Sequence, residues 1–101
     1  MRVMFVCCSG MSTSLLVKKV NRVAQEQGSQ MELFAMSESE ARKDLSAADI
    51  LLLGPQVRYL EPGFRRALEG SSTKLGVVDM LAYGRMDGEK VYNQILELAA
   101  Q

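Results

Sequence analysis

Two adjacent cysteines, Cys7 and Cys8, are the side chains in this chain best suited to covalent chemistry. They follow the apolar run Val3–Val6, and small or hydroxyl-bearing residues lead from them into an amphipathic helical pattern. This order predicts a thiol at the end of a strand, beneath backbone N–H groups and a helix N-terminus, which attract phosphate and favour the thiolate. The segment therefore indicates phosphoryl chemistry on a cysteine, and Cys7 stands where the strand should end.

The expected phosphate-binding loop follows Cys7 directly. Successive N–H groups beside small side chains can approach a phosphate closely, and hydroxyls add donors. The loop residues are Cys8, Ser9, Gly10, Met11, Ser12, Thr13 and Ser14. Two alternatives stay open: Cys7 is a packed, inert cysteine before an ordinary strand-to-helix connection, or Cys8 competes with it as the nucleophile.

The composition excludes other kinds of site. The 101 residues include two cysteines and no histidine. That is too few ligands for a zinc site, and two adjacent cysteines cannot build a disulfide framework. Histidine cannot act as nucleophile, base or phosphate carrier, so covalent chemistry must fall on other side chains. We expect no metal and no cofactor.

Charge and hydropathy limit the partners. Twelve basic and twelve acidic residues balance, so no net field attracts nucleic acid or an anionic membrane. No apolar run approaches the roughly 20 residues of a membrane span, and no signal-peptide pattern is present. We expect a cytoplasmic protein.

Apolar runs alternate with amphipathic segments, which predicts one α/β domain over residues 1–101. Its four-stranded parallel sheet should carry helices on both faces, because crossovers are right-handed. Functional loops then lie beyond the carboxyl ends of the strands. Strands are expected over 2–7, 31–36, 49–55 and 74–79, and four helices over 12–27, from 37, from 61 and after 87.

Side-chain spacing predicts how these elements end and which residues they bury. Gly28 should stop the first helix, and the hydroxyl of Ser37 should cap the second. Asp79 is expected to cap or hold a loop. The expected buried side chains on the helices are Leu16, Val20, Val23, Ala24, Ala41, Leu45, Phe64, Ala67, Leu68, Val91, Ile95 and Leu98.

Three segments resemble enzyme IIB of the lactose/cellobiose family, a component of the bacterial phosphoenolpyruvate-dependent sugar phosphotransferase system. Residues 7–16, C-C-S-G-M-S-T-S-L-L, are similar to the family's active-site loop C-S-A-G-M-S-T-S-L-L and depart from it only at Cys8 and Ser9. Residues 49–59 resemble its D-x-x-L-L-G-P-Q-x-x-Y segment, and residues 79–88 its D-x-x-x-Y-G-x-x-D-G segment. The likeness covers nearly the whole chain.

The resemblance implies the fold of low-molecular-weight tyrosine phosphatases and a phosphoryl relay. A IIA partner carrying phosphate on histidine passes it to the first loop cysteine, which is Cys7 by position. The cysteine passes it to a sugar bound by the membrane component IIC: a β-glucoside, cellobiose, chitobiose or a lactose-like disaccharide. Pro55, Gln56 and Tyr59 follow the third strand, either as a simple turn or as a site wall and partner contact.

Other functions stay open. A tyrosine phosphatase of this fold needs Cys-x5-Arg, because the guanidinium holds the phosphate oxygens in a bidentate grip. That position is Thr13 counted from Cys7 and Ser14 counted from Cys8, which disfavours hydrolysis. A non-catalytic, IIB-like regulatory module is a further alternative. A redox role is less favoured, because the spacing is C-C rather than C-x-x-C.

Overall fold

Four strands form one parallel sheet in the computed structural model, which describes residues 1–7 and 11–101 and, of residues 11–13, only the backbone. The strands are β1 (Arg2–Val6), β2 (Glu32–Met36), β3 (Ile50–Leu53) and β4 (Lys74–Val77), in the order β2-β1-β3-β4. Val6 pairs with Met36 on one side and with Leu53 on the other. The carboxyl ends of the three strands therefore meet at one edge of the sheet.

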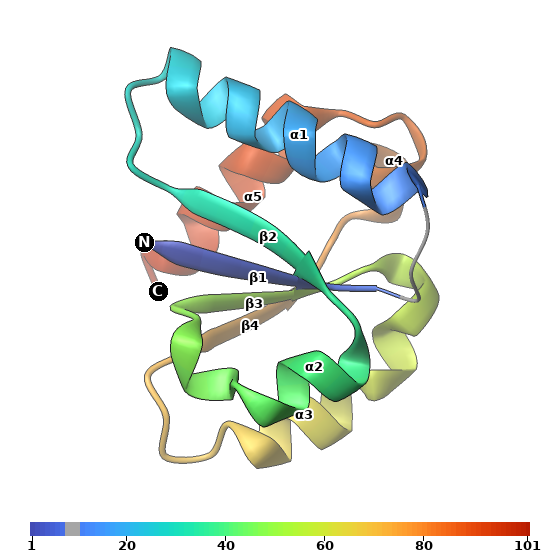
Figure 1. Ribbon diagram of the computed structural model, residues 1–101, viewed down its shortest axis with the longest axis vertical. Helices are drawn as coiled ribbons and strands as arrows, with labels where there is room; N and C mark the ends of the chain where they lie inside the picture. Colours follow the sequence, from blue (N-terminus) through green and yellow to red (C-terminus); the bar gives the residue numbers. More distant parts are fainter. Residues whose placement is uncertain (8–10) are drawn as a thin grey trace.

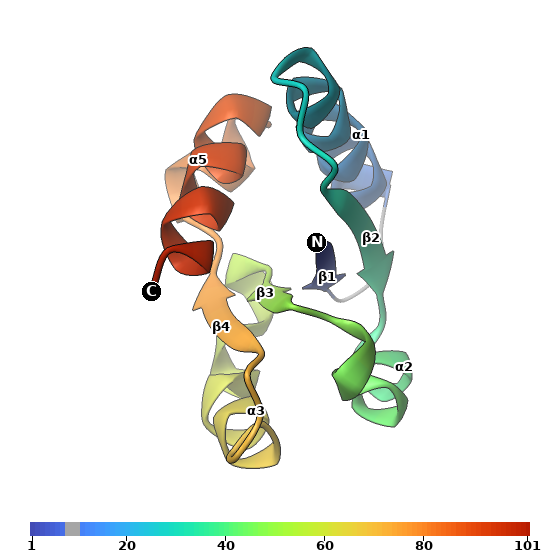
Figure 2. The ribbon, with the colours of Figure 1, turned by 90° about the vertical axis from the view of Figure 1, so that its left-hand side faces the viewer.

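Helices cover both faces of the sheet, as Figures 1 and 2 show. α1 (Met11–Glu26) and α5 (Gly88–Ala99) pack on one face, together with the short α4 (Met80–Gly84). α2 (Glu38–Lys43) and α3 (Glu61–Ala67) pack on the other. Two 3-10 segments, η1 (Leu45–Ala47) and η2 (Pro55–Leu60), precede β3 and α3.

The core is split into two halves by the sheet because side chains alternate along each strand. Val3 and Phe5 of β1 lie in the half that α1, α4 and α5 cover. Met4 and Val6 lie in the half that α2 and α3 cover. All four side chains are fully buried, which explains why β1 reads as a continuous apolar run.

The predicted single α/β domain with a four-stranded parallel sheet and helices on both faces is confirmed. Leu16, Val20 and Ala24 are fully buried. Val23 is half-buried, and Gly28 ends α1 with a φ of 71°. At this left-handed φ a side chain is disfavoured and glycine is not.

Three expectations about the elements are wrong. The sequence predicts four helices, whereas the described residues form five α-helices, the additional one being the five-residue α4. The fourth strand ends at Val77 rather than at Asp79. Asp79 acts as a cap, as expected: it caps α4 by accepting a hydrogen bond from the N–H of Ala82 at 2.9 Å. Ala67 is exposed, since Phe64 and Leu68 alone fill the buried side of α3.

Both edge strands are held by a side-chain amide from the same helical layer. Asn21 of α1 exchanges two hydrogen bonds with the backbone of Leu33 in β2. Gln94 of α5 donates to Val77 O at 2.6 Å and accepts from the N–H of Asp79 at 3.1 Å. Gln94 therefore fixes the turn that leads from β4 into α4.

Among the described residues, no helix is both long and apolar enough to cross a membrane.

Candidate functional site

Cys7 lies at the carboxyl edge of the sheet, one residue beyond β1. Its N–H donates to Met36 O at 3.3 Å, and the preceding Val6 O accepts from the N–H of Gly54 at 2.9 Å. These bonds hold the backbone of Cys7 between the segments that follow β2 and β3. The thiol is unpaired, and only 7% of the residue is exposed. A reagent can therefore reach Cys7 only along a narrow approach.

A cavity of about 390 Å³ provides this approach. One wall comes from the turn after β2 and the start of α2, and the opposite wall comes from η2 after β3. β2 and β3 are the two strands that flank β1, so the sheet order alone brings both walls to the cysteine. The lining residues are Cys7, Ser37, Glu38, Ser39, Val57, Tyr59 and Leu60.

The sequence-predicted wall residues separate into two groups. Tyr59 lines the cavity together with Cys7, and 73% of the residue is exposed. Pro55 is half-buried as the first residue of η2, and Gln56 is exposed beside Gly54. Neither belongs to the lining of the cavity in the described part of the chain. The structure thus brings Tyr59, but not Pro55 or Gln56, to the cysteine.

Four residues of the predicted phosphate-binding segment belong to α1. Met11 through Ser14 form the first turn of α1, with Ser14 exposed. Cys8, Ser9 and Gly10 lie outside the described residues. The first N–H groups of a helix have no partner within the helix and attract anions. A phosphate-binding role for residues 8–14 stays a prediction.

Ser37, Glu38 and Ser39 line the cavity, although their sequence predicted only a helix start. That start is confirmed: Ser37 caps α2, its hydroxyl accepting from the N–H of Glu40 at 3.3 Å while its own N–H donates to Glu40 Oε1 at 3.2 Å. These hydrogen bonds, from the Ser37 backbone first and then its side chain, hold the pKa of Glu40 below its ordinary value. The signal for a site role was their position directly after a strand of a parallel sheet.

Glu38 is the carboxylate of the cavity, and Arg42 fixes its position. Arg42 Nε donates to Glu38 Oε2 at 3.0 Å. The Arg42 guanidinium in turn lies over the ring of Phe64, 4.5 Å from its centroid, and Phe64 is fully buried. The Glu38 carboxylate is therefore bound by a guanidinium that packs on α3, and Glu38 lines the same cavity as Cys7.

Large apolar side chains are exposed around this edge of the sheet. Of the six that the described residues expose, four follow the carboxyl ends of strands: Leu15, Tyr59, Met80 and Leu81. Met80 and Leu81 are 60% and 64% exposed on α4, which contacts α5. An apolar cluster around a reactive group is typical of a surface that a protein partner covers.

Comparison with known families and sequences agrees with the resemblance. Residues 2–94 match the family described as "PTS system, Lactose/Cellobiose specific IIB subunit". The chain is 39% identical over 97 residues to the oligo-beta-mannoside-specific EIIB component of Bacillus subtilis, covering 96% of this chain and 94% of that protein. It is 39% identical over 90 residues to the galactose-specific EIIB component of Lactococcus lactis subsp. cremoris, covering 84% and 83%.

Solved structures show the same fold. The lactose-specific IIB domain of Streptococcus pneumoniae superposes with a TM-score of 0.87 over 97% of this chain and 96% of that one, at 16% identity. The cellobiose-specific IIB component of Borrelia burgdorferi superposes with a TM-score of 0.74 over 99% and 88%, at 27% identity. The first of these similarities supports the fold alone, because its sequence identity is low.

Proposed function

Since this chain belongs to the lactose/cellobiose-specific IIB subunits of the sugar phosphotransferase system, we propose that it is a phosphotransferase that carries the phosphoryl group on Cys7. The observation that supports this most is the placement of Cys7. Cys7 lies just beyond the carboxyl end of β1, one of the two central strands, it lines a cavity, and little of the residue is exposed. A phosphocysteine there would be shielded from bulk water and open to a side chain or hydroxyl that enters the cavity.

In the first transfer, the Cys7 thiolate attacks the phosphorus of a phosphohistidine on a IIA protein. The S–P bond forms and the N–P bond breaks, with the imidazole as the leaving group. The chain itself contains no histidine, so the donor must lie on another protein. Positioning and charge stabilisation carry most of the catalysis in such transfers. The N–H groups of residues 8–14 are our candidates for stabilising the phosphoryl oxygens.

In the second transfer, a sugar hydroxyl attacks the phosphocysteine and Cys7 leaves as thiolate. We propose that a membrane IIC component presents this sugar and that the reaction takes place in the cytoplasm. Relatives of this chain are named for oligo-beta-mannosides, galactose and cellobiose. We propose, from the resemblance to the family, that the acceptor is a β-glucoside, cellobiose, chitobiose or a lactose-like disaccharide, and the name of one relative includes cellobiose.

The test is phosphorylation of the purified chain by a phosphorylated IIA relay, followed by mass mapping of the modified cysteine. We expect phosphate on Cys7 in the wild type and in Cys8→Ser, and no phosphate and no transfer to sugar in Cys7→Ser. Label confined to Cys8 would overturn the assignment. Steady hydrolysis of aryl phosphates by the isolated chain would support the phosphatase alternative. Loading of Cys7 without delivery to any sugar-loaded IIC would support a regulatory module.

A further inference from the structure

The cavity that Cys7 lines is also lined by Glu38, an acidic residue that the relay as described does not use. The two transfers differ in their protons. A thiolate attacking a phosphohistidine has no proton to lose, whereas a sugar hydroxyl must lose one as it bonds to phosphorus. The second transfer therefore calls for a proton acceptor close to Cys7, and the first does not.

Glu38 has the geometry of an oriented base. Oriented bases in active sites are held by a third group that fixes the side chain. Arg42 does this here: its Nε binds Glu38 Oε2 at 3.0 Å, while its guanidinium packs over the buried ring of Phe64. The ion pair occupies Oε2 and leaves Oε1 for another donor. Glu38 is partly exposed, and it lines the cavity, so a molecule in the cavity can reach it.

The cavity has the size and lining of a small-molecule site. Its volume of about 390 Å³ falls within the roughly 300–1,000 Å³ that is usual for such sites. Val57, Tyr59 and Leu60 give it an apolar wall. The opposite wall carries the polar side chains of Ser37, Glu38 and Ser39. A sugar ring needs this combination, because it has apolar C–H faces and a rim of hydroxyls.

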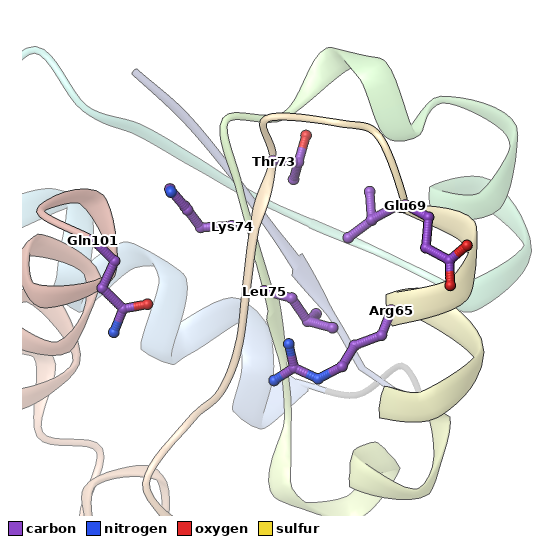
Figure 3. Close-up of a pocket in the computed structure, with 7 residues that line it drawn as sticks. Arg65, Glu69, Thr73, Lys74, Leu75 and Gln101 are labelled. Atoms are coloured by element: carbon purple, nitrogen blue, oxygen red, sulfur yellow. The ribbon is translucent and has the colours of Figure 1, made fainter.

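A second cavity, of about 430 Å³, lies between α3 and the start of β4 (Figure 3). It also contains a carboxylate, that of Glu69, and basic side chains from Arg65 and Lys74. In the described part of the chain no cysteine lines it, and it lies at the amino end of β4, away from the edge where Cys7 lies. Glu69 therefore serves as a matched control for Glu38.

We propose that Glu38 is a catalytic residue of the second transfer, taking the proton of the acceptor sugar hydroxyl inside the Cys7 cavity. This inference rests on the proposed function. The hydroxyl oxygen bonds to phosphorus, the S–P bond breaks, its electron pair stays on Cys7 as thiolate, and the hydroxyl proton moves to Glu38 Oε1. An acidic side chain accepts the hydroxyl proton in protein kinases in the same way. The hydrogen bond also points the hydroxyl lone pair toward phosphorus.

The test measures the two transfers separately. Wild type, Glu38→Gln, Glu38→Asp, Arg42→Gln and Glu69→Gln are each loaded from phosphorylated IIA, and then mixed with IIC membranes and cellobiose or a β-mannosyl disaccharide. Samples quenched at short times show how fast the phosphate leaves Cys7 and how fast it appears on the sugar. Urea unfolding of each variant checks that it is folded. Glu69→Gln makes the same charge change in the other cavity, and Arg42→Gln breaks the ion pair but keeps the carboxylate.

General-base catalysis contributes about 10²-fold or more to such reactions. We therefore expect Glu38→Gln to unload to sugar about 100-fold more slowly while loading within about twofold of wild type. The unloading rates of Glu38→Asp and Arg42→Gln should lie between those of wild type and Glu38→Gln. Glu69→Gln should unload at the wild-type rate. Three results would overturn the role of Glu38. The first is a wild-type unloading rate in Glu38→Gln, and the second is a loss of rate in Glu38→Gln that is equal for loading and unloading. The third is an unloading rate in Arg42→Gln that is as low as in Glu38→Gln. Failure of the wild type to load Cys7 would instead contradict the proposed function on which it rests.

Discussion

The side-chain amide of Asn21 in α1 forms two hydrogen bonds with the backbone of Leu33 in β2. Asn21 Nδ2 donates to Leu33 O at 3.0 Å, and Asn21 Oδ1 accepts from the Leu33 N–H at 3.2 Å. β2 is an edge strand that pairs with β1 on its other side. The amide therefore satisfies backbone groups that no neighbouring strand reaches, and it blocks an edge that could otherwise pair with another chain.

Replacing Asn21 with leucine should destabilise the fold. Leu33 is only 3% exposed, so its N–H and C=O would lose their partners in a poorly hydrated place, at a cost of about 1–3 kcal/mol in the free energy of unfolding. Urea unfolding measures this, and Asn93→Leu on the exposed face of α5 is the control. Equal stability of the two variants would show that water replaces the amide without loss.

Gly88 is a point of close approach between α5 and α1, and adding a methyl group there should separate the helices. A Cβ on Gly88 would lie 3.0 Å from the carbonyl carbon and Cβ of Lys19. Backbone atoms of a helix cannot move aside cheaply, so we expect Gly88→Ala to lower the free energy of unfolding by about 1–3 kcal/mol. Gly84→Ala in α4 is the control, because a Cβ there meets nothing within 4 Å. Thermal unfolding of both variants tests this, and a neutral Gly88→Ala would contradict the tight contact.

Glu40 should make stability depend on pH in the acid range. Its folded-state pKa is lowered from 4.5 by the hydrogen bonds to Ser37, so folding favours the ionised carboxylate. This contribution is fully present above the unfolded pKa and is lost as the pH falls through the lower folded value. Urea midpoints measured from about pH 6 to about pH 3 should fall less steeply in Glu40→Gln and Ser37→Ala than in wild type. Ser46→Ala, an exposed serine of η1, should keep the wild-type slope; unchanged slopes in the first two would argue against this linkage.

The exposed apolar residues of α4 should matter for docking of the phosphate donor rather than for folding. Leu81 is 64% exposed at the edge of the sheet where Cys7 lies. If the donor covers it, Leu81→Gln should slow loading of Cys7 by about fivefold at low donor concentration, which corresponds to about 1 kcal/mol. Leu96→Gln is the control, since Leu96 lies near the C-terminal end of α5 and is also exposed. Equal loading rates in both variants would place the donor elsewhere.

Much of the fold could be predicted from the sequence because its signals are local. Val3–Val6 and Ile50–Leu53 are continuous apolar runs, as strands buried on both faces require. Gly28 and Ser37 end and begin helices through their own backbone and side-chain chemistry. The sequence did not predict α4, because its five residues are too few to show a helical period and Ala82 is its only buried residue.

The site could be predicted only in part. Cys7 at the end of the first strand followed from the apolar run, and Tyr59 from its place after the third. Ser37, Glu38 and Ser39 line the same cavity as Cys7 only because β2 lies beside β1, and strand order is a long-range property that local patterns do not encode. The position of Glu38 depends further on Arg42, which is set by the packing of α2 on Phe64 of α3.

The hydrogen bonds from Gln94 to Val77 and Asp79 should affect the kinetics of binding to a partner protein. Because α5 fixes this turn and Asp79 caps α4, Met80 and Leu81 are presented on a preorganised surface. Little conformational entropy is then lost when a protein binds there, so even a small contact area can suffice. Encounters on such a surface can be both fast to form and short-lived. The proposed relay, in which this chain would bind one protein, release it and bind another within each cycle, needs this combination.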